Sequence, residues 1–480
     1  MTEQDPRVPW QRYLVTPYTR RRVLQRGAQL GGGIAGALSI SQLLAACGIT
    51  GTQPTASGTA APAATGAATT GAPDTLRVLL ANHTGFYAMV TPDFESANNT
   101  TIEFTREAFG ALPSVLTPAF ETGGESWDVV YLWRAWVDQY EQYLTPLEQI
   151  SGWQQPDESQ LRWEAVEAAK ASSGTWYGGP SNIYTYVLFC NRQTFEDAGV
   201  EIPTTYDQFV AAAQQFTTEG KFGYVDGWAP LYLFPKWCVW LHLNGGRFYG
   251  DDGSVNFNSP EAVQATQDMI DLLPFMPADV IESPWGIYDV EAKKVFLAGD
   301  AAMMIDYQHL WYQSRDPNLS ALGEDPVRVA VIPGKGGGLP ATGGQSVGEC
   351  FAIPLTSQKK ELALQLVNHY ASAETQLGLL TRREELHGFD PADESGFPSF
   401  SSPYEDASIP EADQTIVDAT FQQAQDTALN QRYGTRAGYQ RISEIVEAHV
   451  SAAFHGADVA AEHETGQAEI DQFLQDNPEM

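Results

Sequence analysis

The stretch WYGGPSNIYTYVLFCN runs from Trp176 to Asn191 and joins a turn to a long strand. Its early residues Gly178, Gly179 and Pro180 are typical of turns. From Tyr184 onward the stretch is rich in aromatic and aliphatic side chains, which favour extended, half-buried backbone. The sequence therefore predicts a turn that leads directly into a long strand.

The residues before this stretch alternate between strands and helices. Short apolar strands are expected at residues 76–80 and 101–104, and a third buried run follows at 128–132. Helices are expected between them, at 86–98 and 113–121. Such alternation is typical of an α/β fold, in which a parallel sheet carries helices on both faces.

The carboxyl ends of two of these strands carry polar and aromatic side chains. Asn82 and His83 end the first strand, and Trp133, Arg134 and Trp136 follow the third. Ligands of such sheets bind beyond the carboxyl ends of the strands. We therefore expect both segments to contribute to a binding site.

The chain divides by composition into a linker and a large folded part. Residues 48–73 are almost all Gly, Ala, Thr, Ser and Pro, with no charged or aromatic residue. Such a segment cannot bury a core and is predicted to be a flexible linker, spanning roughly 25–30 Å as a random coil. Residues 74–480 are rich in apolar side chains and long enough for two cores, so two lobes are expected.

The segment before the linker contains a glycine-rich motif, Gly31-x-Gly33-x-x-Gly36, inside an uncharged run. A dinucleotide-binding loop needs a buried strand before it and a helix after it, and the sequence offers neither. The uncharged run is long enough to span a membrane as a helix. The run contains few large apolar residues, however, and its polar residues would be costly in hydrocarbon.

An export signal explains this segment better than either alternative. Arg20 and Arg21 precede a modestly apolar run and resemble a twin-arginine export signal. Residues 44–47, LAAC, resemble a lipobox, in which the cysteine receives a diacylglyceryl group. We expect residues 1–46 to be a signal peptide and Cys47 to anchor the protein to the outer face of the cell membrane. An uncleaved amino-terminal anchor is the alternative.

The charge of the chain excludes nucleic acid as a partner. The formal net charge is -33, from 27 basic and 60 acidic residues. Residues 1–46 contribute +4 to this total, which leaves -37 for the remainder. Phosphates would be repelled by this charge, and so would anionic lipid, which makes a covalent anchor necessary.

The three other cysteines, Cys190, Cys238 and Cys350, lie in apolar contexts with no metal-type spacing. Buried inert thiols are the favoured interpretation. One disulfide among them is the alternative in an extracytoplasmic protein.

Eight blocks of sequence stand in a fixed order along residues 74–476. They are TPLEQI from Thr145, the stretch from Gly174 to Thr217, LNGG from Leu243, VNFNSPEAVQATQDMIDLL from Val255, FLAGDAAMMIDYQHLW from Phe296, VAVIPGKGGGLPATGG from Val329, ECFAIPLTSQKKELALQLVNHYASAETQLGLL from Glu349, and HGADVAAEHETGQAEIDQFLQD from His455. Together these blocks resemble family 1 of the extracellular solute-binding proteins, which serve carbohydrate ABC importers.

This resemblance implies a two-lobed periplasmic-binding-protein fold joined by hinge strands. The strand at 184–191 would cross from one lobe to the other, residues 347–354 would cross back, and a third crossing would lie near 386–389. The lobes would comprise 74–185 plus 347–387, and 186–346 plus 388–480. Two such lobes can close on a ligand.

The resemblance also implies a carbohydrate ligand, held by aromatic plates and planar polar groups. For several candidates a structural role is the alternative. One of Trp133 and Trp136 would be a core ring, and so would Tyr184. Asn82 would cap a helix, and Asp306 would be a solvated carboxylate. Residues 381–403 depart from the family pattern, and their role is open. The candidate ligand-binding residues are Asn82, His83, Trp133, Arg134, Trp136, Tyr184, Trp228, Trp285, Asp306, Tyr307, Trp311, Gly344 and Gln345.

Catalytic motifs are weak by comparison. Gly344-x-Ser346-x-Gly348 fits the serine-hydrolase elbow, but that motif needs a strand before the serine and a helix after it. Here a glycine-rich loop precedes the serine and a strand is expected after it. The eight histidines are scattered, so no metal site is expected, and no cofactor is implied.

We therefore predict a monomeric, lipid-anchored binding protein that is not an enzyme. It would deliver a carbohydrate to the permease subunits of an ABC importer. A secreted glycoside hydrolase and a binding protein for a polyamine remain the alternatives.

Overall fold

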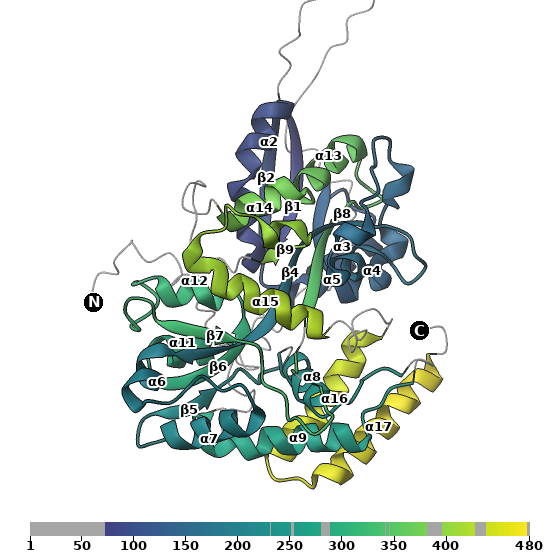
Figure 1. Ribbon diagram of the computed structural model, residues 1–480. Coiled ribbons are helices and arrows are strands. Elements are labelled where there is room, and N and C mark those ends of the chain that lie inside the picture. The colour runs from purple at the N-terminus through teal and green to yellow at the C-terminus, as the bar shows by residue number, and fades with distance from the viewer. Residues whose placement is uncertain are drawn as a thin grey trace, which may run out of the picture. The chain divides into compact units, whose positions relative to one another are not determined.

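The computed structural model describes residues 73–230, 232–250, 254–279, 289–340, 342–344, 346–381, 396–427 and 438–477 (Figure 1). Residues Pro73–Met480 form one compact unit. The predicted export signal at Arg20 and Arg21, the lipid site Cys47 and the third crossing near 386–389 lie outside the described residues. Within the described residues, no helix combines the length and apolar character needed to cross a membrane.

The strands among the described residues form one nine-stranded sheet in the order β2-β1-β3-β8-β4-β6-β5, with β7 and β9 also paired to β4. Their bounds are β1 Asp74–Ala81, β2 Thr100–Glu107, β3 Val129–Trp133, β4 Gly178–Asn191, β5 Phe222–Val225, β6 Ala301–Tyr307, β7 Val327–Ala330, β8 Ser346–Ala352 and β9 Phe397–Pro398.

The long strand β4 divides this sheet into two parts. Its residues from Gly178 to Thr185 pair with β8, and its residues from Tyr186 to Cys190 pair with β6. We call the part made of β2, β1, β3, β8, β9 and the first portion of β4 the N-sheet. The part made of β6, β5, β7 and the second portion of β4 is the C-sheet.

The predicted strand at the quoted stretch is confirmed, and it is longer than predicted. It already begins at Gly178, so the glycines and proline expected in a turn belong to the strand. The pairing with β8 shifts register between Pro180 and Asn182. Proline cannot donate a hydrogen bond to a neighbouring strand and is tolerated at such an irregularity.

The prediction of a parallel sheet is only partly correct. β1 pairs in parallel with both β2 and β3, as the alternation of strands and helices predicted. β8 is antiparallel to β3, and β4 is antiparallel to β8. The mixed sheet arises because β4 and β8 run in opposite directions between the N-sheet and the C-sheet.

Helices cover both sheets (Figure 1). α5 packs against β8 and β4 of the N-sheet, whereas α8, α9, α16 and α17 pack against one another beside the C-sheet. The helices are α2 Thr91–Asn98, α3 Leu112–Glu121, α4 Arg134–Tyr140, α5 Trp163–Ala169, α6 Arg192–Ala198, α7 Tyr206–Phe216, α8 Leu233–Leu243, α9 Pro260–Leu272, α11 Asp289–Leu297, α12 Leu310–Arg315, α13 Lys360–Tyr370, α14 Ala373–Thr381, α15 Gln414–Thr427, α16 Tyr439–Phe454 and α17 Val459–Asp476.

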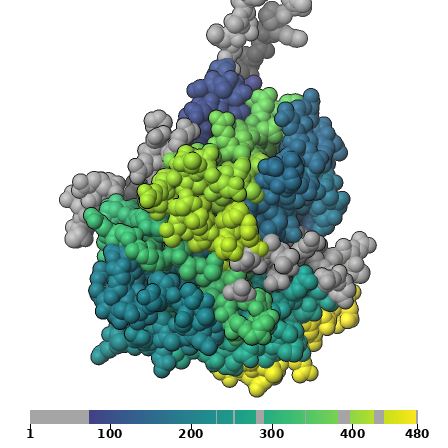
Figure 2. All heavy atoms as spheres, viewed as in Figure 1, coloured from purple at the N-terminus to yellow at the C-terminus, as the bar shows by residue number. Residues whose placement is uncertain are grey.

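α15 lies at the junction of the two sheets. It contacts both β4 and β7. Nearby, the Trp311 indole nitrogen of α12 donates a hydrogen bond to Asp413, at 2.7 Å. Figure 2 shows the yellow-green surface of this segment between the upper and lower parts of the unit.

The three cysteines Cys190, Cys238 and Cys350 are buried and free, as their apolar contexts predicted. Burial raises the pKa of each thiol, because the thiolate loses hydration in the core. The structure thus places three unreactive thiols in the core and forms no disulfide among them.

The close approach of β8 to α5 requires glycine at position 348. A Cβ atom built on Gly348 would lie 2.2 Å from the backbone carbonyl oxygen of Glu164. We expect Gly348→Ala to lower the free energy of unfolding in urea by about 1–3 kcal/mol, since strand and helix must separate. Gly124→Ala is the control, because its Cβ would meet nothing closer than the Ser126 hydroxyl at 3.6 Å. Equal stability of the two variants would contradict this close packing.

Candidate functional site

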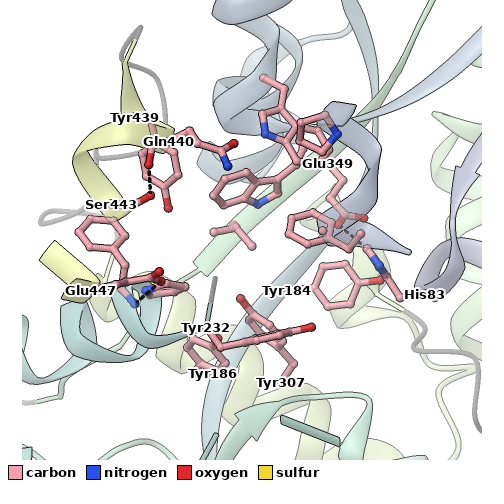
Figure 3. A pocket seen from close by; sticks show the side chains of 18 residues that line it. His83, Tyr184, Tyr186, Tyr232, Tyr307, Glu349, Tyr439, Gln440, Ser443 and Glu447 are labelled. Carbon is pink, nitrogen blue, oxygen red and sulfur yellow. Dashed lines mark hydrogen bonds and ion pairs between the residues drawn. The ribbon is translucent and has the colours of Figure 1, made fainter. Parts of the chain in front are cut away.

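A pocket lies beyond the carboxyl ends of β1 and β3, between the two sheets (Figure 3). Half of its lining residues are Phe, Trp or Tyr. The lining residues are His83, Phe109, Gly110, Pro113, Trp133, Trp136, Tyr184, Tyr186, Tyr232, Phe234, Pro235, Tyr307, Val347, Glu349, Tyr439, Gln440, Ser443 and Glu447.

One wall of the pocket consists of three rings, two from the end of β3 and the start of α4 and one from the segment after β2. Trp136, in the first turn of α4, stacks on Phe109 with ring centroids 5.1 Å apart. Trp133 meets both of these rings edge to face, at 5.8 Å from Phe109 and 6.0 Å from Trp136. Because each ring packs against the other two, the wall keeps its shape without a ligand.

The opposite wall is a pair of stacked tyrosines from the C-sheet. The rings of Tyr186 and Tyr307, which are register partners on β4 and β6, lie 4.0 Å apart and nearly parallel. The ammonium of Lys236 lies 4.2 Å from the centre of the Tyr186 ring. The stack is therefore supported from behind by a cation–π contact.

Lys236 is itself held by buried acceptors. Its ammonium forms an ion pair with Asp226 at 2.7 Å, and both side chains are 1% exposed. It also donates to the carbonyl oxygen of Ile305 on β6. Asp226 accepts further hydrogen bonds from the Tyr224 hydroxyl at 2.6 Å and the Gly227 amide at 2.8 Å. Burial raises the pKa of Asp226, and the nearby Lys236 charge opposes this shift.

A polar cluster lies at the N-sheet end of the pocket, around Glu349 of β8. The Glu349 carboxylate accepts hydrogen bonds from the Asn182 amide at 2.7 Å and from the Tyr131 hydroxyl. The Nε2 atom of His83 lies 2.9 Å from the same carboxylate. The His83 ring also meets Tyr184 edge to face, at 5.6 Å. The four groups hold one another in place and present Glu349 and His83 to the pocket.

Helix α16 closes the pocket from the C-sheet side. Tyr439, Ser443 and Glu447 are spaced four residues apart and therefore share one face of the helix. Figure 3 shows these side chains, with Gln440, facing His83 and Glu349 across the pocket. Glu447 accepts a hydrogen bond from the Phe234 amide at 3.1 Å. Tyr439 reaches Trp133 of the N-sheet, with ring centroids 5.3 Å apart.

The structure brings five of the predicted site residues into this pocket. They come from the end of β1, the end of β3, and strands β4 and β6. The five are His83, Trp133, Trp136, Tyr184 and Tyr307.

Three other described candidates do not line the pocket. Asn82 is exposed. Arg134 is buried and forms an ion pair with Glu167 at 3.0 Å. Trp228 packs on Phe454 in the core.

The remaining three described candidates have partners of their own. Asp306 is buried beside Lys293, at 3.6 Å, and accepts a hydrogen bond from the Tyr307 amide. Trp311 is buried under Arg315. The carbonyl oxygen of Gly344 lies 2.7 Å from Nδ1 of His242. Trp285 and Gln345 lie outside the described residues.

Sequence reasoning missed the lining that comes from distant segments. Phe109, Tyr232 and the whole face of α16 were not singled out, because no short motif marks them. The spacing of Tyr439, Ser443 and Glu447 was an available signal, but it equally describes a helix packed on a core. Glu349 lay within the predicted return strand and was interpreted as part of that strand alone.

The structure gives no support to the hydrolase motif. Ser346 begins β8 and is buried, and its hydroxyl donates to Glu164 at 2.6 Å. It therefore lacks the exposed position between a strand and a helix that a nucleophile elbow requires. Among the described residues, no group of His, Cys, Asp and Glu side chains is arranged to hold a metal ion.

Residues 80–377 match the family model of bacterial extracellular solute-binding proteins. The chain belongs to this family. Its members are binding proteins that act outside the cytoplasm, and the resemblance drawn from the sequence is confirmed at this level.

Curated relatives match over limited stretches. The arabinooligosaccharide-binding protein of Halalkalibacterium halodurans is 25% identical over 105 residues, which cover 22% of this chain and 23% of that protein. The sn-glycerol-3-phosphate-binding periplasmic protein UgpB of Salmonella typhimurium is 32% identical over 142 residues, 28% of this chain and 31% of UgpB. The matched stretches thus span less than a third of either relative.

The solved structures match over almost the whole folded part. T. maritima MalE3 with bound maltose has a TM-score of 0.69 and 19% identity, covering 83% of this chain and 100% of MalE3. This likeness shows that the fold is the two-lobed solute-binding fold.

The ion pair behind the tyrosine stack predicts a large loss of stability in Lys236→Met. Asp226 would be left as a buried charge without its cation, which costs about 3–5 kcal/mol of unfolding free energy. Without Lys236 the pKa of Asp226 would rise further in the folded state. The folded protein would then bind more protons than the unfolded chain, so the loss should be larger at about pH 8 than at about pH 5.

Urea unfolding of Lys236→Met at both pH values measures this effect. Lys221→Met is the control, because Lys221 pairs with Asp300 at 2.8 Å where both side chains are about half exposed, and such pairs contribute at most about 1 kcal/mol. An equal loss of unfolding free energy in the two lysine variants would mean that the buried ion pair does not stabilise the tyrosine stack.

Proposed function

We propose that the protein binds a carbohydrate in this pocket, a disaccharide or oligosaccharide, and hands it unchanged to the permease subunits of an ABC importer. The observation that supports this most strongly is the pair of facing aromatic walls. Trp133 ends β3 of the N-sheet and Trp136 lies in α4, which follows it, whereas Tyr186 and Tyr307 come from the C-sheet. Sugar rings have weakly apolar C–H faces that stack on such aromatic plates.

The polar groups between these walls suit the hydroxyls of a sugar. Glu349 and His83 lie at one end, and Gln440, Ser443 and Glu447 lie on α16. Ligand pockets commonly combine a mostly apolar lining with a few placed polar groups of this kind. A sugar between the walls would contact both.

The comparisons add support for a carbohydrate. The Halalkalibacterium halodurans relative binds an arabinooligosaccharide, and the MalE3 structure contains maltose. Among the candidates predicted from the sequence, we assign ligand contact to His83, Trp133, Trp136, Tyr184 and Tyr307, the five that line the pocket.

Closure of two lobes on the ligand would drive delivery. We assign residues 74–185 plus 347–387 to one lobe and 186–346 plus 388–480 to the other. A ligand that touches both lobes only in the closed form shifts the population toward that form. The importer would then recognise the closed form.

The amino-terminal segment indicates where in the cell the protein would act. We infer that Arg20 and Arg21 direct export, that the peptide 1–46 is removed, and that a lipid on Cys47 anchors the protein to the outer face of the cell membrane. Residues 47–73 would link this anchor to a monomeric binding unit.

A thermal-shift screen of the full chain against a panel of mono-, di- and oligosaccharides tests the proposed function. A ligand that binds the native state raises the melting temperature. At a free concentration about a hundredfold above its Kd, it adds about 2.7 kcal/mol to the free energy of unfolding. Trp133→Ala should weaken the binding of the sugar found in this way by about tenfold or more.

Trp127→Ala is the matched control, since Trp127 lies before β3 and Trp133 lies at its other end. It should bind the same sugar with unchanged affinity. Appearance of cleaved sugar during incubation would favour a glycoside hydrolase, and absence of any shift across the panel would overturn the proposed function.

A further inference from the structure

Glu349 is a buried carboxylate that reaches the pocket from the middle of the N-sheet. Its strand β8 lies between β3 and β4, and its register partners on those strands are Trp133 and Asn182. Side chains of register partners lie on the same face of a sheet, so the carboxylate lies beside the tryptophan wall. Glu349 is only 2% exposed and still lines the pocket (Figure 3).

Three groups of the protein donate hydrogen bonds to this carboxylate. Its Oε1 atom accepts from the Tyr131 hydroxyl and lies 2.9 Å from Nε2 of His83. Its Oε2 atom accepts from the Asn182 amide, at 2.7 Å. An ionised carboxylate has no proton to give, so the His83 nitrogen donates as well. Tyr131 and Asn182 are 0% and 2% exposed and are not part of the pocket lining.

The Asn182 amide has further partners that fix its orientation. Its oxygen accepts from the Ser181 hydroxyl at 3.0 Å and from the Tyr87 hydroxyl at 3.3 Å. The nitrogen of the same amide therefore faces Glu349. Burial raises the pKa of both Tyr87 and Tyr131, and the Glu349 charge contributes to each rise. Both phenols keep the protons that they donate, so the protein holds the carboxylate in one position.

The carboxylate keeps an acceptor position for a ligand. Its two oxygens together offer about four lone-pair positions. Among the described residues, Oε1 is contacted by Tyr131 and His83, whereas Oε2 accepts a hydrogen bond from Asn182 alone. Since Glu349 lines the pocket while Tyr131 and Asn182 do not, the remaining position on Oε2 is left for a group that enters the pocket.

A sugar hydroxyl can donate to this position, and an atom without a proton cannot. Hydrogen bonds to charged groups are among the stronger ones in proteins. A fluorine or an ether oxygen at the same place would bring lone pairs against those of the carboxylate. A hydrogen atom would leave the acceptor without a partner in the closed pocket. Sites that hydrogen-bond a ligand hydroxyl therefore reject analogues without it more strongly than apolar pockets do.

We propose that Glu349 determines which saccharides bind, by accepting a hydrogen bond from one ligand hydroxyl through Oε2. This inference rests on the proposed function and narrows its ligand class to saccharides in which that hydroxyl is free. Saccharides that are methylated, acylated or glycosidically substituted at this oxygen are excluded. Asn182 acts through Glu349, as a positioning residue.

A series of sugar analogues tests this acceptor in the full wild-type chain. Glucose, maltose and cellobiose are the first parent sugars, followed by every other saccharide of the panel that raises the melting temperature. Calorimetry compares each parent with its monodeoxy and monofluoro derivatives, one ring position at a time. At one position we expect the deoxy sugar to bind about tenfold to a hundredfold more weakly than the parent, and the fluoro sugar at least as weakly as the deoxy sugar. A hydrogen-bond donor in the pocket would instead favour fluorine over hydrogen.

The variant Glu349→Gln identifies the residue responsible, because a neutral amide both accepts and donates. We expect the ratio of the Kd of the fluoro sugar to that of its parent to fall by about tenfold. Glu349→Asp is the second variant, and it should lower the ratio too, since its oxygens are withdrawn by one methylene. Glu103→Gln is the control, because Glu103 is exposed on β2 of the same sheet, and it should keep the ratio.

The outcomes separate the two proposals. If no ring position shows this order of affinities, or if the ratio is unchanged in a folded Glu349 variant, the role of Glu349 is wrong and carbohydrate binding stands. A panel in which no saccharide raises the melting temperature would overturn both.

Discussion

Strand β4 is the constraint on which both sheets depend. All of its residues from Gly178 to Asn191 are buried, so every backbone N–H and C=O along it needs a partner. The N-sheet supplies partners up to Thr185 and the C-sheet supplies them from Tyr186. Neither sheet can be displaced at this point without leaving buried backbone groups unpaired.

The crossing point also fixes the pocket. Tyr184 and Tyr186 are two residues apart on one strand, so their side chains point to the same face. One belongs to the N-sheet and the other to the C-sheet, and both line the pocket. Side chains brace this point: the hydroxyls of Thr185 and Ser346 lie 2.7 Å apart, and Gln308 bridges the Thr185 amide and the Ile183 carbonyl. The pocket thus forms where the backbone is most constrained.

The part of the site that follows from local sequence could be predicted, and the part that follows from long-range packing could not. His83, Trp133 and Trp136 were found because ligands of α/β sheets bind at strand ends, a rule that needs only the strand positions. The same rule selected Arg134, but the side chain of Arg134 forms a buried ion pair with Glu167 of α5 and does not line the pocket. Tyr439 and Glu447 stand about 300 residues after Trp133 in the chain. No local pattern specifies a contact over that separation. The direction of β8 was likewise set by the return path of the chain.

The aromatic contact between Trp133 and Tyr439 links the two sides of the pocket in the form described here. Such an edge-to-face pair contributes about 0.5–1.5 kcal/mol beyond its buried area, far less than the backbone hydrogen bonds of the crossing strands taken together. Separating the two sides would therefore break the ring contact before it disturbed β4 or β8. A ligand bound as proposed would give up that one ring contact and add contacts to both sides of the pocket, so it would favour the closed form.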